Sequence, residues 1–103
     1  NLLDYDKSER NNSQYIVMEV GEECTATRDE IIEVLHAENI LARKYFWPGC
    51  HRMKPFRDLY PHAGLLLPNT IKVSNTVVVL PTGTTMDVNM IRTVASVIRV
   101  LLD

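Results

Sequence analysis

Residues 14–39 read QYIVMEVGEECTATRDEIIEVLHAEN, and the hydrophobic pattern of the chain changes within them. Up to Gly21, every second residue would face the same side of an extended chain, as in a half-buried strand. The residues on that side are Ile16, Met18 and Val20. The alternation predicts a β-strand over 14–20 that ends at the glycine.

The second part of the same segment has the pattern of a helix. Thr27 followed by Glu30 is typical of a capping box, in which each side chain accepts a hydrogen bond from the backbone N–H of the other residue. The next apolar residues are three and four positions apart, which predicts a helix over 28–38 with one side packed on a sheet. They are Ile31, Val34 and Leu35. Asn39 suits the left-handed conformation in which helices often end.

The rest of the chain continues this mixture of strands and helices. We predict a strand over 42–47, a long loop over 48–68 with a helical turn at 55–60, a helix over 68–76, a strand over 77–80 and a terminal helix after the N-cap Asp87. The terminal helix carries an apolar stripe of Ile91, Val94, Ala95, Ile98, Leu101 and Leu102. Three strands with helices on one face predict an α+β two-layer sandwich with a small, mostly antiparallel sheet.

The composition is typical of one ordinary globular domain, with 103 residues of which 46% are hydrophobic and 23% are charged. The net charge is −2 and no basic stripe is present, which argues against a nucleic-acid partner. No apolar run approaches the ~18 residues that cross a bilayer, so we expect no membrane span. Cys24 and Cys50 are too few for a disulfide framework and indicate free thiols in a reducing compartment. We therefore expect a cytoplasmic protein.

Motifs for phosphate binding, nucleophilic catalysis and metal binding are absent. The four glycines form no phosphate-binding loop, and no serine stands between two glycines as in a nucleophile elbow. The spacings of the cysteines and histidines match no zinc pattern. We expect no metal site.

One group of residues is a candidate binding site. Tyr45, Phe46 and Trp47 end the second predicted strand, and His51 follows in the long loop. Amphipathic rings and an imidazole at the end of a strand fit a ligand pocket. They fit core packing with a histidine at its rim equally well, and the residues alone favour neither interpretation.

The passage from Ala42 to His51, ARKYFWPGCH, resembles the small C-terminal domain of the DegT/DnrJ/EryC1/StrS sugar aminotransferases, which depend on pyridoxal phosphate (PLP). In that family a strand ends in aromatic residues, followed by a proline, a histidine and a basic or polar run. The last third of the chain is similar too, with a short apolar strand that ends at Leu80-Pro81 and a terminal helix after Asp87. The resemblance extends over nearly the whole chain from about Gln14 onward.

The resemblance implies the small domain of a fold-type I PLP-dependent transferase. Residues 1–13 would be the linker from a missing large domain, in keeping with their polar composition and the absence of an initial methionine, and residues 14–103 would be the small domain. The whole enzyme would aminate a nucleotide-linked keto sugar of the dTDP-deoxyhexose type, with glutamate as the amino donor, and would be a homodimer.

The resemblance also implies how much of the active site this chain would contain. The Schiff-base lysine is expected in the large domain, so this chain would hold no catalytic residue, bind no PLP and be inactive alone. Tyr45, Phe46, Trp47 and His51 would line the substrate side of the cleft. Some members of the family dehydrate their sugar instead of aminating it. The alternative function is a free-standing interaction or dimerisation domain.

Overall fold

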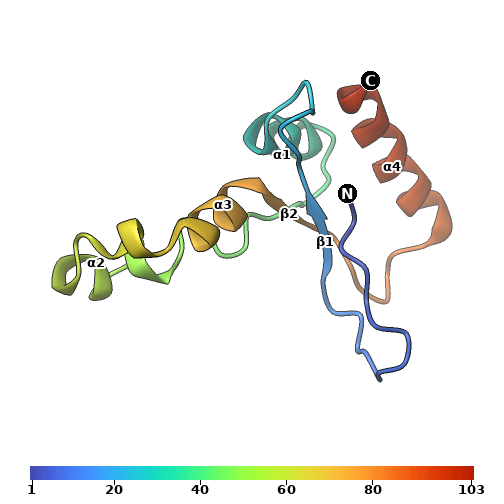
Figure 1. Ribbon diagram of the computed structural model, residues 1–103. Coiled ribbons are helices and arrows are strands. Elements are labelled where there is room, and N and C mark those ends of the chain that lie inside the picture. Colours follow the sequence, from blue (N-terminus) through green and yellow to red (C-terminus); the bar gives the residue numbers. More distant parts are fainter.

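A two-stranded antiparallel sheet lies at the centre of the molecule (Figure 1). The computed structural model describes residues 1–103. Strand β1 (Ile16–Glu19) pairs with β2 (Val77–Leu80) in a register that puts Met18 opposite Val78. Paired residues share a face of a sheet, and both of these side chains are buried. This face of the sheet therefore forms one wall of the core.

Six helical segments connect and cover the strands. They are α1 (Arg28–Ala37), the 3₁₀ turn η1 (Cys50–Arg52), α2 (Phe56–Leu59), the 3₁₀ turn η2 (Ala63–Leu66), α3 (Pro68–Thr76) and α4 (Val88–Leu102). Helices α1 and α4 share one core with the sheet, formed by Met18, Val20, Ile31, Ile32, Leu35, Ala42, Val78, Val94 and Ile98. We call β1, β2, α1 and α4 the body of the molecule.

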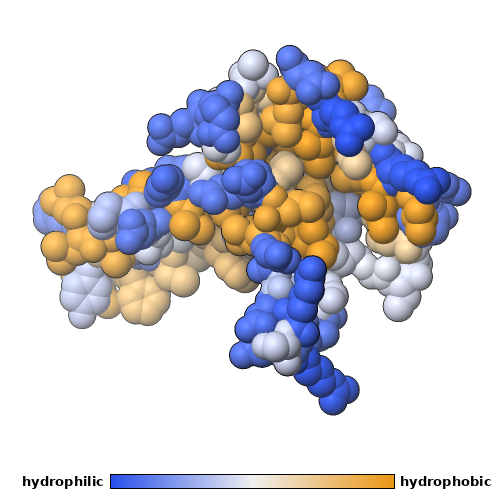
Figure 2. Space-filling view, turned by 45° about the vertical axis from the view of Figure 1, so that its right-hand side comes forward, coloured by the Kyte–Doolittle hydropathy of each residue, from blue (hydrophilic) through white to orange (hydrophobic).

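Residues 48–76, which we call the arm, extend away from the body as a row of short helical segments (Figure 1). Every residue of η1, α2 and η2 is at least partly exposed. The extension gives the chain a radius of gyration of 15.6 Å, against about 13 Å for a compact domain of this length. Figure 2 shows apolar surface along the arm as well as on the body.

The expected α+β class and the antiparallel sense of the sheet are confirmed, but the third strand, predicted over 42–47, is wrong. Only Arg43 pairs with the sheet, as a single bridge to Val79. Beyond it the backbone turns, with the Trp47 N–H donating to the Lys44 carbonyl over 2.7 Å. The aromatic residues that raised the strand propensity lie in this turn, because such propensity reflects packing on a sheet more than a backbone preference.

The free edge of β1 is also paired at only one position. Leu2 forms an antiparallel bridge to Met18, and the Leu3 N–H donates to the Val17 carbonyl over 2.9 Å. Part of the predicted linker over 1–13 thus pairs with β1. Two strands with a single bridge on each side take the place of the expected three-stranded sheet.

Most predicted helices form where local signals placed them. The capping box of Thr27 and Glu30 starts α1, and Asn39 follows its end with a φ of 59°. Asp87 caps α4, and α3 and β2 have the predicted bounds. Of the predicted stripe on α4, only Val94 and Ile98 are buried. The helical turn predicted at 55–60 is α2, whereas η1 and η2 were not predicted because turns this short show no periodicity.

None of these helices combines the length and the apolar character that spanning a membrane requires.

Candidate functional site

The three predicted aromatic residues form a turn at the base of the arm, which we call the aromatic turn (Tyr45, Phe46 and Trp47). The rings of Tyr45 and Phe46 stack with their centroids 5.0 Å apart, and Tyr15 meets Tyr45 edge-on at 6.0 Å. Phe46 is 65% exposed and Trp47 is 49% exposed. Large rings at this exposure are available to a ligand or to another protein surface.

Tyr45 also lines a cavity of about 380 Å³ at the edge of the sheet. Arg43 lies beside it, with its guanidinium carbon 5.6 Å from the centroid of the Tyr45 ring. The other residues of this cavity include Gln14, Tyr15 and Thr82. No role is predicted for Tyr15 or Arg43 from the sequence, although the alternation of the strand predicted over 14–20 places Tyr15 on the face opposite the core. Phe46, Trp47 and His51 do not line this cavity.

His51 is held in the arm between two glycines. A methyl group on Gly49 would lie 2.9 Å from His51 Nδ1, and one on Gly64 would lie 3.7 Å from His51 Nε2. Gly49 also has a φ of 94°, a conformation that other residues rarely adopt. Gly49 thus leaves the space in which the imidazole sits, whereas a methyl group on Gly64 would make only an ordinary van der Waals contact with it.

Both ring nitrogens of His51 are buried and have no hydrogen-bond partner. Buried polar atoms in folded proteins are nearly always paired, so an unpaired imidazole indicates that water or another molecule supplies the partner. His36 differs, since its Nε2 lies 2.8 Å from the Ala42 carbonyl oxygen. His51 is therefore the histidine whose ring nitrogens are both buried and unpaired. Its imidazole forms no hydrogen bond with the aromatic turn.

A polar cluster lies between α1 and the aromatic turn. Asp29 Oδ1 accepts from Arg28 Nε at 2.6 Å and lies 2.7 Å from Lys44 Nζ. The bond to Lys44 lowers the pKa of Asp29, burial opposes it, and Arg28 adds to the lowering. Lys44 Nζ also lies 5.7 Å from the centroid of the Trp47 ring. A buried arginine is thus linked through one carboxylate to a lysine that faces an exposed indole.

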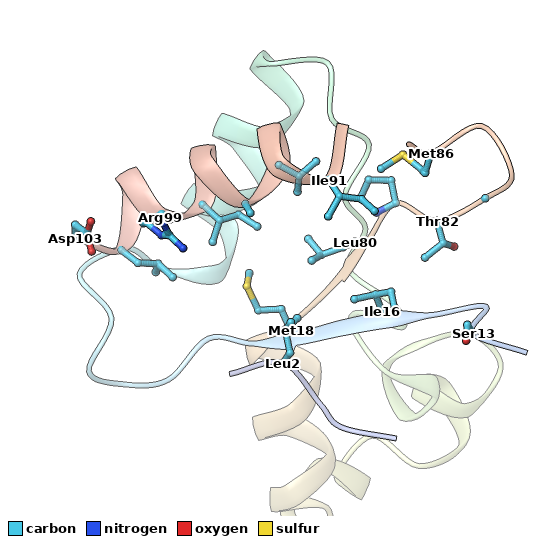
Figure 3. A pocket seen from close by; sticks show the side chains of 16 residues that line it. Leu2, Ser13, Ile16, Met18, Leu80, Thr82, Met86, Ile91, Arg99 and Asp103 are labelled. Atoms are coloured by element: carbon cyan, nitrogen blue, oxygen red, sulfur yellow. The ribbon is translucent and has the colours of Figure 1, made fainter. Parts of the chain in front are cut away.

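A second cavity, of about 740 Å³, lies elsewhere, between the sheet and α4 (Figure 3). Leu80, Met18 and Ile16 face it from the strands and Ile91 faces it from α4, with Arg99 and Asp103 near the C-terminal end of the helix. It contains none of the predicted site residues. Its walls are mainly apolar, which suits contact with an apolar ligand group or with another apolar surface.

No group of three or more histidine, cysteine, aspartate or glutamate side chains is placed to hold a metal ion. Cys24 and Cys50 are unpaired, as predicted.

The sequence profile of the DegT/DnrJ/EryC1/StrS aminotransferase family matches residues 2–99. A solved structure, described as DesI in the presence of its TDP-sugar product, is 42% identical in sequence and superposes with a TM-score of 0.84. The match covers 97% of this chain, which spans 25% of the DesI chain. No curated protein matches significantly. The family match over nearly the whole length shows that this chain belongs to the DegT/DnrJ/EryC1/StrS aminotransferase family.

Proposed function

We propose that this chain is the small C-terminal domain of a PLP-dependent aminotransferase that aminates a nucleotide-linked keto sugar of the dTDP-deoxyhexose type. The observation that carries the proposal is the likeness to DesI, at 42% identity and a TM-score of 0.84, because the DesI structure was obtained with a TDP-sugar product. Residues 14–103 would be the small domain and residues 1–13 the connection to the large domain, in which a Schiff-base lysine would lie.

In the proposed enzyme, the PLP site lies outside this chain. No lysine lines either of the two cavities described above. Of the four lysines, Lys44 and Lys54 lie near aspartates, Asp29 and Asp58. The cofactor would therefore be held by the large domain, and this chain would supply part of the wall of the cleft.

In the proposed enzyme, Tyr45, Phe46, Trp47 and His51 contact the sugar nucleotide. The rings pack against the sugar or the base, and the imidazole hydrogen-bonds to a hydroxyl or a phosphate oxygen. The unpaired, buried nitrogens of His51 support this role, because a ligand oxygen would satisfy one of them.

The test compares variants of His51 in the whole aminotransferase. We expect His51→Ala and His51→Phe each to raise KM for the sugar nucleotide about two- to tenfold, because each removes one hydrogen bond. His62→Ala is the matched control, since His62 is an exposed histidine of the same arm. If both His51 variants keep the original KM and kcat, the assignment is wrong. If only His51→Ala has an effect, the imidazole serves to fill the space beside Gly49.

The reaction itself is tested by the absorbance of PLP in the whole protein. Glutamate should change the spectrum as the amino group is transferred, and the keto sugar should restore it. Glutamate as donor, the homodimer and a cytoplasmic location are parts of the same proposal. Sugar that is consumed without net consumption of the donor would instead indicate a dehydratase.

The apolar cavity between the sheet and α4 favours a second candidate, an interaction domain without catalysis. Its apolar lining is typical of a surface that another protein covers. The gene sequence separates the candidates, and light scattering of the 103-residue chain tests whether the exposed apolar surface drives self-association. An open reading frame that starts near Asn1 favours the interaction domain, whereas a PLP-type lysine encoded upstream favours the aminotransferase.

A further inference from the structure

The inner end of the polar cluster is fixed to the backbone. Arg28 is only 4% exposed, and its Nη1 donates to the carbonyl oxygens of Ser74 at 2.8 Å and Val77 at 3.3 Å. Ser74 belongs to the last turns of α3 and Val77 begins β2, so the guanidinium joins α1 to the base of the arm. Its Nε donates to Asp29. The carboxylate of Asp29 is therefore held by a group that is itself buried and paired.

The outer end of the cluster reaches the aromatic turn. Lys44 precedes that turn, and its ammonium lies 2.7 Å from Asp29 Oδ1 and 5.7 Å from the centroid of Trp47. Both distances are within the range of a direct interaction, an ion pair and a cation–π contact respectively. One ammonium thus bridges a fixed carboxylate and the single tryptophan of the chain.

An isolated pair of exposed charges holds its side chains weakly, because the pair loses conformational entropy and is screened by water. This pair differs in that Asp29 is already oriented by Arg28, so that forming the bond orders chiefly the lysine. Arg28 and Lys44 are the charged groups that contact Asp29. Because Lys44 also contacts Trp47 through the cation–π interaction, a fixed ammonium limits the orientations of the indole.

We propose that Asp29 and Lys44 are positioning residues that hold Trp47 in the orientation in which it contacts the sugar nucleotide. This inference rests on the proposed function of the aromatic turn. Neither residue touches the substrate. Both act through the indole. The indole is thereby fixed relative to the first turn of α1, which belongs to the body.

The experiment uses the whole aminotransferase and measures both Trp47 and catalysis. Subtracting the emission of the matching Trp47→Phe protein isolates the fluorescence of Trp47 in each background. We expect Lys44→Met and Asp29→Asn to increase quenching of Trp47 by acrylamide and to raise KM about two- to fivefold, with kcat nearly unchanged. Lys44→Arg keeps a cation and should restore much of both properties.

Two controls test whether Lys44 acts through Trp47. Lys54→Met removes the same charge from an exposed pair on the arm, Lys54–Asp58 at 3.9 Å, and should alter neither readout. In a Trp47→Ala background, Lys44→Met should add no further increase in KM, because its effect passes through the indole.

If Trp47→Ala raises KM but Lys44→Met changes neither quenching nor KM, the positioning role is wrong and the proposed function stands. If Lys44→Met changes quenching but neither it nor Trp47→Ala changes KM, the indole does not contact the substrate, and both the aromatic turn's proposed role and the inference built on it fail.

Discussion

The body and the arm differ in the solvent exposure of their apolar side chains. In the body, Ile31, Leu35 and Val78 are essentially inaccessible to water. In the arm, Leu65 and Leu66 are 82% and 84% exposed. Burial of apolar surface is the main stabilising contribution to folding, so the body holds most of the stability of this chain.

The order of the arm has a different source. Its short segments are closed by local backbone hydrogen bonds, such as Tyr60 N–H to the Phe56 carbonyl at 2.8 Å. Its base is joined to the body through Arg28. Substitutions in the body should therefore change the free energy of unfolding, whereas substitutions at the surface of the arm should change contacts with other molecules.

The largest expected difference comes from one leucine in each region. Leu35→Ala leaves a cavity among α1, α4 and the sheet and should lower the free energy of unfolding by about 2–5 kcal/mol. Leu65→Ala should change it by less than about 0.5 kcal/mol, because Leu65 is exposed. Urea denaturation measures both, and equal losses would contradict the division into body and arm.

A smaller effect is expected where the two regions join. Arg28→Met removes the donor to the carbonyls of Ser74 and Val77, and we expect a loss of about 1–3 kcal/mol. Arg57→Met, at an exposed position of α2, serves as the control and should cost less than about 0.5 kcal/mol. Amide hydrogen exchange should also increase in α3 in the Arg28 variant. Unchanged exchange there would show that the arm is not held through this arginine.

The helix cap of α1 should contribute less again. Thr27→Ala removes the hydroxyl that accepts from the Glu30 N–H, at a cost of about 1 kcal/mol. Thr84→Ala, in the loop before α4, is the control and should be nearly neutral. A loss in the control as large as that in Thr27→Ala would mean that the cap itself contributes nothing.

The smallest effect concerns pH. Since Lys44 lowers the pKa of Asp29 in the folded chain, the contribution of Asp29 is present above its ordinary pKa. It is lost as the pH falls through the lowered folded value. The difference in Tm between the parent chain and Asp29→Asn should therefore be constant near neutral pH and shrink in acid. A difference that does not change with pH would contradict the ion pair with Lys44.

Sequence reasoning succeeded where neighbouring residues are sufficient to define the structure. Thr27 with Glu30, Asp87 before α4 and Pro68 at the start of α3 act within one helical turn, so their effect is visible in the sequence. It failed for residues 42–47, where aromatic side chains left the sheet for a turn. It also gave no sign that Arg28, at the start of a helix, is buried.

The same distinction between local signals and distant contacts applies to the candidate site. Tyr45, Phe46, Trp47 and His51 were identified from their residue types and their order in the chain. Their surroundings come from residues distant in sequence, since Gly64 lies beside His51 and Asp29 pairs with Lys44. No local pattern reports such pairs.

Caps, periodicity and prolines were thus enough to define α1, α3, β2 and α4, because each of these signals acts over a few residues. The tertiary contacts settled the number of strands, the extension of the arm and the isolation of the His51 nitrogens. These features depend on which distant segments meet, and that is governed by packing across the whole chain and not by the preferences of any one segment.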